Sequence, residues 1–550
     1  MPKLHLISLG CTKNLVDSEV MLGALSHYER VNDVQDADII IINTCGFIAS
    51  AKKESIDKIL EVALIKKDGA ILIVSGCLSE RYADELQSEI PEIDIITGVG
   101  DYDKIESMIQ RVVDSSCGNS SLDKHSADLL NFGRSQTSSL VSRPKFSKSN
   151  ESHTENPSVV LKTESKSDSS LRESATLSKV ADSWQSAEFV SKAKQPFKNS
   201  PSIAESFAFD SPSLAEGVRG WVNSTKSPQI IKSPQTFLIE NQKRIITGSA
   251  IHAYIKISEG CNQQCSFCAI PHFKGRLHSR NLDSILREIE SLLAKGYFDF
   301  SFIAQDSSSY MRDLGKKDGL IDLIKRIESS GAKSARILYL YPSTTDENLI
   351  RTIAESSVFQ NYFDMPLQHI SDKMLKTMKR GADKARHIAL LEQMRNCENS
   401  FIRTSFLLGH PRESEADFDE LCEFVSEFSF ERANIFGFSR EEGTAAFDMG
   451  DIVSAKTTKA RTKKLNNILA KHQKNSLKSL VGRKIRAIVE GRSAQSDLLF
   501  SARDLRWDRE IDGEILINDS EIPLARGYYE VQITDFKGGY LLGRAVSKNV

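Results

Sequence analysis

Short apolar runs alternate with segments of helical periodicity along two stretches of the chain, and this alternation limits the fold more than any other feature. In the first stretch, three runs read as strands: Lys3–Leu9, Asp38–Asn43 and Ala70–Ser75. Helical patterns follow at Leu15–Ser26 and Phe47–Lys66, and again after the third run. Short apolar strands joined by helices imply βαβ units, so we predict an α/β domain with a parallel sheet over residues 1–114.

The second stretch begins near Arg244 and repeats the pattern. Its strand candidates are Ala253–Ile257, Phe300–Ala304, Ala335–Leu340, Tyr362–Asp364, Ile402–Leu407 and Arg432–Phe438. Helical segments separate most of them: Leu282–Lys295, Leu320–Ser329, Asp383–Cys397 and Glu415–Phe428. Six such βα repeats predict a partial (β/α)6 barrel over residues 241–478, with its chemistry at the C-terminal ends of the strands.

The rest of the chain divides into a linker and a final domain, because 550 residues are too many for one hydrophobic core. Residues 115–240 show no lasting periodicity, and serine supplies roughly a quarter of them, so we expect a disordered insertion there, without chemistry. A basic helical stretch, Ser454–Ser479, leads to a segment of short strands. These strands predict a small β-barrel over residues 479–550: Lys484–Glu490, Asp497–Ser501, Glu514–Ile517, Tyr528–Phe536 and Tyr540–Ala545.

Charge and hydropathy narrow the classes of function. The chain has 72 Lys and Arg against 74 Asp and Glu, so any site for nucleic acid or acidic lipid must be local. No apolar run approaches the roughly 18–20 residues that span a bilayer, and the Met-Pro-Lys start is unlike a signal peptide. We therefore expect a cytoplasmic protein without a membrane partner. Clustered thiols in that compartment are more often metal ligands or catalysts than disulfides.

The sharpest chemical signal is the segment Gly260–Cys268, here called the cysteine loop, which follows the Ala253–Ile257 strand. It reads Gly260-Cys261-Asn262-Gln263-Gln264-Cys265-Ser266-Phe267-Cys268. Three thiolates this close together can hold three irons of a cubane cluster and leave the fourth iron open. S-adenosylmethionine can chelate the open iron, and an electron from the cluster then cleaves the sulfonium to a 5′-deoxyadenosyl radical. A structural zinc site is the alternative, but zinc prefers four closed ligands and no second Cys-x2-Cys pair lies downstream.

A second set of cysteines is dispersed. Cys11, Cys45 and Cys77 each follow one of the first three strands, and each stands next to a glycine. Because the C-terminal ends of parallel strands share one edge of a sheet, we expect these thiols to converge and hold a second cluster with an open iron. Buried cysteines are often only small apolar residues, but three at equivalent places favour ligands. Cys397 and Cys422, in helical segments, are predicted to be packing residues.

On these residues the chain resembles the radical S-adenosylmethionine methylthiotransferase family, over nearly all of its length outside residues 115–240. The Cys-x3-Cys-x2-Cys loop is typical of the superfamily, the three N-terminal cysteines are typical of the methylthiotransferases, and the closing barrel looks like their TRAM module. The resemblance implies two 4Fe–4S clusters and S-adenosyl-L-methionine as cofactors, with no catalytic side chains beyond the cluster ligands.

The same resemblance implies a division of labour between the clusters. The cluster on Cys261, Cys265 and Cys268 would bind and cleave S-adenosylmethionine. The cluster on the dispersed cysteines would carry the sulfur that a first S-adenosylmethionine methylates, and the radical from a second would remove hydrogen from the substrate carbon.

Two branches of this family differ in substrate: isopentenylated adenosine of transfer RNA, or an aspartate of small-subunit ribosomal protein 12. The chain is similar to the second, RimO-type branch, because Gly10-Cys11-Thr12-Lys13-Asn14 stands where the other branch usually has Gly-Cys-Gln-Met-Asn. Pro366–His369, Ser439–Thr444 and Ile511–Gly513 are also similar to it. This implies methylthiolation of the β-carbon of an aspartate of ribosomal protein 12, free or in the ribosome, with a reductant such as flavodoxin or ferredoxin. A transfer-RNA (N6-isopentenyladenosine) methylthiotransferase and a non-catalytic iron–sulfur carrier remain the alternatives.

Charge in the last segment bears on this choice. Residues 490–522 hold nine acidic residues and four arginines. An RNA-binding barrel should present positive charge to the phosphates, so the acidic excess favours a basic protein substrate; an ordinary solvated surface is the alternative. The basic stretch from Lys456 to Lys474 is interpreted as the exposed face of a helix that could still touch ribosomal RNA.

Several polar residues near strand ends are weaker candidates for the site. Gln305 and Asp306 follow one barrel strand, and Arg336 and Tyr341 flank the next. A helix N-cap is the alternative role for Asp306. The chain also reads Gly409-His410-Pro411-Arg412-Glu413 where the family often has Gly-Phe-Pro-Gly-Glu, and losing the second glycine is expected to alter a turn near the cofactor.

Overall fold

The computed structural model describes residues 1–116, 229–231 and 243–549, which divide into two compact units. The described part of the first unit comprises Met1–Leu9 and residues 17–116, 229–231 and 243–245. The described part of the second unit comprises Gly10–Val16 and residues 246–549. Most of the predicted serine-rich insertion, 115–240, lies outside the described residues.

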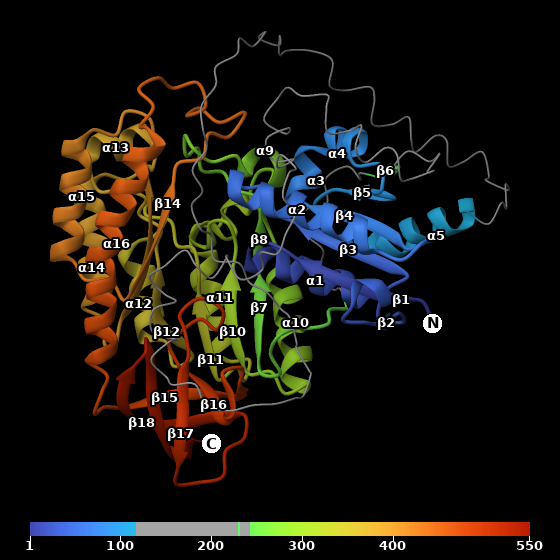
Figure 1. The fold of residues 1–550 in the computed structure, drawn as a ribbon. Helices are drawn as coiled ribbons and strands as arrows, with labels where there is room; N and C mark the ends of the chain where they lie inside the picture. The colour runs from blue at the N-terminus through green and yellow to red at the C-terminus, as the bar shows by residue number, and fades with distance from the viewer. Residues whose placement is uncertain (117–228, 232–242, 550) are drawn as a thin grey trace. The chain divides into compact units, whose positions relative to one another are not determined.

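The first unit is built on a parallel sheet, as predicted (Figure 1). The strand order is β2-β1-β3-β4-β5-β6, with bounds Lys3–Ser8 (β1), Glu29–Arg30 (β2), Ile39–Thr44 (β3), Ile71–Gly76 (β4), Ile95–Thr97 (β5) and Gln229–Ile231 (β6). The central β3 is buried along its whole length because helices cover both faces of such a sheet. Strand β6 corrects the prediction of an unstructured 115–240, since its three residues pair with β5.

Helices complete this unit: α1 (Thr12–Ala24), α2 (Ala49–Ile65), α3 (Cys77–Arg81), α4 (Ala83–Glu89) and α5 (Ile105–Ser116). One face of the sheet packs against α1 and α5, where Met21, Met108 and Ile41 belong to one buried cluster. Helix α1 begins within Gly10–Val16, the short segment that groups with the second unit.

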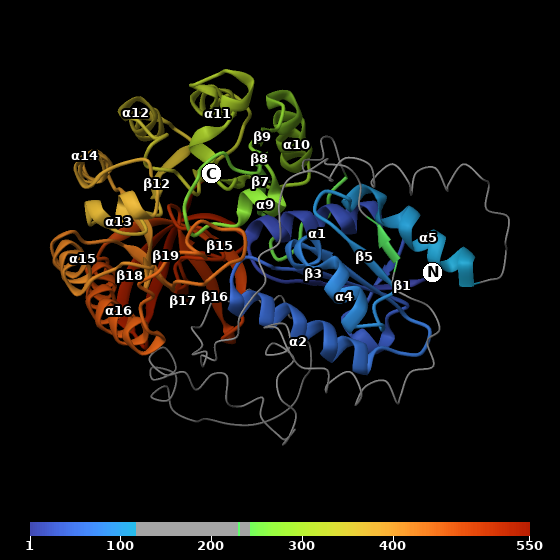
Figure 2. The same cartoon turned by 90° about the horizontal axis from the view of Figure 1, so that it is seen from above.

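The second unit contains the predicted open barrel of parallel strands, in the order β14-β13-β12-β11-β10-β7. The bounds are His252–Lys256 (β7), Asp299–Ile303 (β10), Ser334–Ile337 (β11), Phe359–Asp364 (β12), Phe401–Leu408 (β13) and Arg432–Gly437 (β14). The helices are α9 (Ile270–Lys274), α10 (Leu282–Ala294), α11 (Gly319–Glu328), α12 (Glu347–Glu355), α13 (Asp372–Thr377), α14 (Lys384–Arg395), α15 (Glu415–Glu427) and α16 (Ala455–Lys478). Seen from above, α10, α11, α12, α14 and α15 form an arc outside the strands (Figure 2).

The chain ends in a closed barrel, as predicted, with strand order β15-β16-β17-β19-β18. Its strands are β15 (Lys484–Ser493), β16 (Ser496–Asp504), β17 (Ile515–Ser520), β18 (Gly527–Lys537) and β19 (Tyr540–Asn549). This C-terminal barrel lies against the N-terminal ends of β10 and β11: Arg503 pairs with Asp299, and the Tyr528 hydroxyl is 2.9 Å from Ser334 Oγ. It therefore covers the end of the parallel barrel opposite to the cysteine loop (Figure 1).

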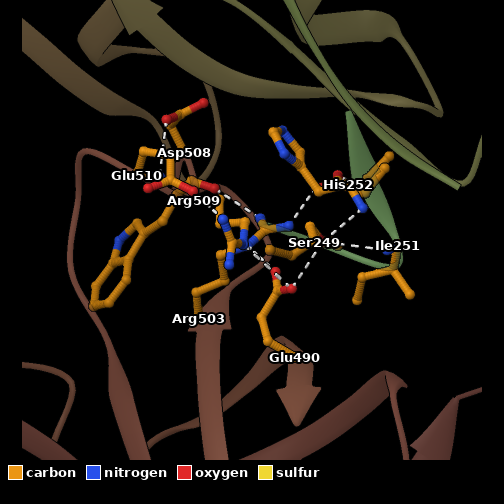
Figure 3. Close-up of polar contacts among 12 residues, drawn as sticks. Ser249, Ile251, His252, Glu490, Arg503, Asp508, Arg509 and Glu510 are labelled. Atoms are coloured by element: carbon orange, nitrogen blue, oxygen red, sulfur yellow. Dashed lines mark hydrogen bonds and ion pairs between the residues drawn. The ribbon is translucent and has the colours of Figure 1, made fainter. Parts of the chain in front are cut away.

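A buried ionic network joins the two barrels of this unit (Figure 3). Asp299, fully buried, accepts two hydrogen bonds from Arg336 and one from Arg503. Arg503 also donates to Glu490 at 2.9 Å. His252 lies beside this network, and burial holds its pKa well below the ordinary value. Arg336, a candidate for the site, is therefore a structural residue in the contact with the C-terminal barrel, at the end of the parallel barrel away from the cysteine loop.

The network changes the interpretation of the acidic C-terminal segment. Asp508 and Asp512 are almost fully buried, and Asp508 accepts hydrogen bonds from Tyr254 and Ser301 of the parallel barrel. Glu490 pairs with two arginines and Glu510 with one. Part of the acidic excess thus balances arginines within the unit, and the charge count alone does not describe the exposed surface. No helix in the described ranges is both long and apolar enough to cross a membrane.

Candidate active site

The cysteine loop leaves the C-terminal end of the β7 region through a glycine that the geometry requires. Gly260 has φ +76°, and a Cβ there would lie 2.1 Å from the carbonyl oxygen of Arg276. The Cys261 amide donates to the Gly275 carbonyl at 3.1 Å, and the Cys268 amide to the Cys265 carbonyl at 3.1 Å. Only glycine accepts both the positive φ and this close backbone approach.

Cys265 has a cationic and a phenolic neighbour. Arg380 Nη1 lies 3.2 Å from Cys265 Sγ, and the Tyr341 hydroxyl lies 3.3 Å from the same sulfur. The Arg380 guanidinium also stacks 4.3 Å from the centroid of the Tyr341 ring. Tyr341 and Arg380 therefore both contact a predicted cluster ligand, and we count both as part of the candidate site.

The other two thiols are more deeply buried. Burial raises the pKa of Cys261 to about 12 and that of Cys268 well above its ordinary value. Both thiols are within electrostatic range of Cys265. Throughout the described residues, no three His, Cys, Asp or Glu side chains already stand in metal-ligand geometry. The donor set itself, three thiols on one short loop, still suits iron, whose binding would displace the thiol protons.

Two candidates from the end of β10 hold the loop from one side. Gln263 Nε2 donates to Asp306 Oδ2 at 2.8 Å, which ties the cysteine loop to the next strand. Asp306 also caps the short 3-10 helix Ser307–Ser309 by accepting from the Ser309 amide. The N-cap role of Asp306 is therefore confirmed, and the same side chain also contacts the cysteine loop. Gln305 donates to Glu259, which directly precedes the loop.

Glu259 anchors an ion cluster beneath the loop. Its carboxylate is fully buried, 2.7 Å from Lys256 Nζ and 3.6 Å from Lys274 Nζ. Burial alone would raise the pKa of Glu259, but the two ammonium groups outweigh it and hold the pKa at about 2. The carboxylate is thus ionised at neutral pH and fixes the strand from which the loop departs.

The loop Gly409–Glu413 packs against the cysteine loop. His410 Nε2 lies 3.0 Å from Ser266 Oγ, between two of the cysteines, and His410 is fully buried. Arg412, where the family often has glycine, takes φ +69°. This left-handed conformation costs a residue with a Cβ about 1–2 kcal/mol. The expectation that the turn is altered relative to the family stays a prediction.

A lysine that the sequence reasoning did not single out lies at the mouth of the barrel. Lys13 Nζ is 3.6 Å from the centroid of the Tyr339 ring and 3.5 Å from the Ala304 carbonyl oxygen. Ala304 follows β10 and Tyr339 follows β11, at the strand ends where the cysteine loop also begins. Lys13 belongs to the motif Gly10-Cys11-Thr12-Lys13-Asn14, so its place in that motif could have identified it as a site residue. Arg380 follows a short helix and carries no motif that could have found it.

Each of the three N-terminal cysteines follows a strand of the first sheet. Strands β1, β3 and β4, which precede Cys11, Cys45 and Cys77, are neighbours in the sheet. Cys45 and Cys77 are buried, and a Cβ at Gly46 would lie 2.8 Å from the Cys77 carbonyl oxygen. Cys11 lies in the segment that groups with the second unit, and its sulfur is 4.0 Å from Asn14 Oδ1.

Comparison with known proteins shows the family of the chain. Residues 3–98 match the model of Uncharacterized protein family UPF0004, and residues 255–425 match the Radical SAM superfamily. The chain is 46% identical to the ribosomal protein uS12 methylthiotransferase RimO of Wolinella succinogenes, over 98% of this chain and 97% of that protein. It is also 46% identical to the protein of the same name from Helicobacter pylori strain 26695, over 99% and 98%.

Among solved structures, the chain is similar to the radical S-adenosylmethionine methyltransferase TsrM from Kitasatospora setae. The identity is 13%, the TM-score is 0.45, and the match covers 81% of this chain and 74% of that one. The near full-length identity to the curated relatives is decisive, because it spans both units and the C-terminal barrel. The chain belongs to the RimO family of radical S-adenosylmethionine methylthiotransferases.

Proposed function

We propose that this enzyme methylthiolates the β-carbon of an aspartate of ribosomal protein uS12, using two S-adenosylmethionine molecules and two 4Fe–4S clusters. The names of its relatives support the protein substrate. The reaction belongs to the cytoplasm, with a flavodoxin- or ferredoxin-like reductant.

The single observation that carries the choice of an aspartate is Lys13. Its ammonium group lies at the strand ends that surround the cysteine loop, against the Tyr339 ring. An aspartate that reacts at its β-carbon brings a carboxylate into this mouth, and burying a carboxylate without a cationic partner is costly. A base of transfer RNA brings no such charge, and the transfer-RNA branch usually has methionine at this position. Lys13 therefore suits the amino-acid substrate.

The cysteine loop fits the first cluster. Cys261, Cys265 and Cys268 would hold it, and when bound it supplies the electron that cleaves S-adenosylmethionine. Arg380 would remain near the Cys265 sulfur and keep negative charge there favourable. Gln263 and Asp306 would hold the loop in place through their hydrogen bond. The second cluster would be held by Cys11, Cys45 and Cys77.

Mass spectrometry of ribosomal protein uS12 and of transfer RNA, from cells with and without the gene, tests the substrate. We expect a methylthio group to be lost only from an aspartate of the protein. Loss only from modified adenosine would move the enzyme to the transfer-RNA reaction and would make the role given to Lys13 wrong.

Purified variants test the cofactor assignment. Cys265→Ala should abolish cleavage of S-adenosylmethionine and remove roughly half of the iron, since each cluster holds about four irons. Cys397→Ala is the matched control, because Cys397 is also a half-buried free thiol but bonds only to the Gln393 carbonyl. Retained cleavage in Cys265→Ala would count against the assignment.

A variant of Lys13 tests the aspartate. Lys13→Met should reduce the preference for an aspartate-bearing over an asparagine-bearing uS12 peptide by at least tenfold, and Lys13→Arg should restore part of it. Lys464→Met removes a lysine that lies 5.2 Å from the Phe418 ring, on the outer helices, and serves as the control. An unchanged preference in Lys13→Met would remove the argument for its role.

A further inference from the structure

Helix α16 has a charge distribution that the proposed reaction does not use. Its 24 residues, Ala455–Lys478, contain seven lysines and one arginine but no aspartate or glutamate. Because the whole chain carries −2 and α16 carries +8, the other residues together carry −10. Exposed helices usually mix both signs, since oppositely charged pairs one turn apart stabilise them. Helix α16 is thus strongly net positive in a chain whose other residues are net negative.

Most of this charge lies on one face of the helix. We call six exposed side chains the lysine ridge: Lys456, Lys459, Lys463, Lys471, Lys474 and Lys478. Their spacing keeps them within a single stripe, while Leu465 and Leu469 face the protein core. The ridge extends over about 33 Å, at a rise of about 1.5 Å per residue.

The ridge is not neutralised within the protein. On α16, Arg461 pairs with Glu413 and Glu415, and Lys464 pairs with Asp419. None of the six ridge lysines forms an ion pair with any residue that the structure describes.

One end of the ridge lies close to the active site. Thr458, in the first turn of α16, abuts Gly409: a Cβ on that glycine would lie 2.2 Å from Thr458 Oγ1. The same loop carries His410, which contacts Ser266 of the cysteine loop. From there α16 runs along the parallel barrel toward the C-terminal barrel (Figure 1). A partner bound along the ridge would therefore reach the mouth of the barrel.

The chemistry of the ridge selects RNA over a protein. A protein interface needs apolar or aromatic anchors at its centre, and the exposed positions of α16 hold only Lys, Asn and Ala. Asn466, Asn467 and Asn475 interleave with the lysines and can donate to phosphate and sugar oxygens. A long, straight array of one sign matches the regular charge of a phosphodiester backbone.

We infer that the lysine ridge binds the RNA backbone of a ribonucleoprotein substrate, so that the enzyme modifies uS12 after the protein has assembled with small-subunit RNA. This inference rests on the proposed function and specifies the form of its substrate. The C-terminal barrel is not required for this contact.

The test compares two substrates, isolated uS12 and purified small subunits that lack the modification. The variant Lys463→Gln/Lys471→Gln/Lys474→Gln removes three ridge charges without adding a poor helix former. The control Lys295→Gln/Lys316→Gln/Lys325→Gln removes three exposed lysines of the same unit outside α16. Both variants change the net charge equally, so bulk charge cannot explain a difference between them.

For wild type, six contacts predict that kcat/KM on small subunits falls roughly 300- to 2,000-fold between 50 and 200 mM salt. The ridge variant should lose about two to three units of the slope of log kcat/KM against log salt, and the control should lose none. The ratio of kcat/KM on subunits to that on isolated uS12 should fall at least tenfold only in the ridge variant.

Three results would overturn the inference. The ratio could stay the same in both variants, which would show that RNA does not use the ridge. The rate could fall equally on both substrates together with slower reduction by flavodoxin, which would make the ridge a site for an acidic electron carrier. If wild type modifies neither substrate, the proposed function itself fails, which is a distinct outcome from a failure of the ridge alone.

Discussion

Replacing Arg503 should detach the C-terminal barrel from the parallel barrel more effectively than any exposed substitution. The guanidinium is 2% exposed and bonds to three groups: the Asp299 carboxylate, Glu490 at 2.9 Å and the Trp507 carbonyl at 2.9 Å. Arg503→Met keeps most of the aliphatic volume but removes all three bonds. Asp299 then keeps its pair with Arg336 and the hydrogen bond from Ser334.

The magnitude follows from these contacts. Removing one partner of a buried ion pair costs about 3–5 kcal/mol, because a charge is left in a poorly solvated place. The remaining pair with Arg336 partly compensates Asp299, so we expect a loss near the lower end, about 3 kcal/mol. Arg503→Lys keeps the charge but loses the forked geometry, and it should cost less.

Fluorescence of Trp507 provides the assay. This side chain is 2% exposed and faces the parallel barrel, with its ring 6.5 Å from that of Phe401. The other two tryptophans, Trp184 and Trp221, can be replaced by phenylalanine so that a urea transition reports on Trp507 alone. The control is Arg544→Met, an arginine of the same barrel that is 45% exposed and also contacts two carboxylates, Asp519 and Glu521.

The control should lose at most about 1 kcal/mol, since exposed ion pairs contribute little. If Arg503→Met loses no more than Arg544→Met, the buried network does not hold the two barrels together and the reasoning is refuted. If Arg503→Met is already unfolded without denaturant, the loss in free energy of unfolding is measured on Arg503→Lys instead.

Three further outcomes are expected. Burial raises the pKa of Asp512 to about 6, so the free energy of unfolding should fall as pH rises from about 4 to 6. The free energy of unfolding of Asp512→Asn should exceed that of wild type by an amount that grows across this range to about 3 kcal/mol. Urea unfolding at several pH values measures it. Gly260→Ala places a Cβ against the Arg276 carbonyl oxygen at φ +76°, so reconstituted protein should contain roughly half of the iron, by elemental analysis, while far-ultraviolet circular dichroism stays unchanged. Arg380→Met removes a cation 3.2 Å from the Cys265 sulfur, so the midpoint potential of that cluster, followed by electron paramagnetic resonance, should become more negative, whereas an unchanged potential would contradict the contact.

The long periodic segments of the fold could be predicted from sequence, and short elements could not. The predicted Phe47–Lys66 and Glu415–Phe428 correspond to α2 (Ala49–Ile65) and α15 (Glu415–Glu427), because their apolar spacing determines a helix before any packing. Strand β6 pairs only three residues with β5 and lies inside a serine-rich segment, so tertiary pairing decides its conformation.

The candidate site shows the same division. Cysteine spacing identified the loop, but the contacts of Arg380 and Lys13 come from segments far apart in sequence and are set by the topology of the barrel. Charge counting on residues 490–522 failed for a related reason: composition does not distinguish an exposed carboxylate from Asp508, which accepts hydrogen bonds inside the unit.

The shared carboxylate of Asp299 also restricts how this family can evolve. The Asp299 carboxylate pairs with Arg336 from the neighbouring strand and with Arg503 from the C-terminal barrel. Arg503 lies 204 positions after Asp299 in the sequence. No single substitution at Asp299 can suit both partners, so a change there must be accompanied by a change at one of the arginines. We expect these three positions to be inherited as a set, even in relatives whose exposed surfaces have diverged.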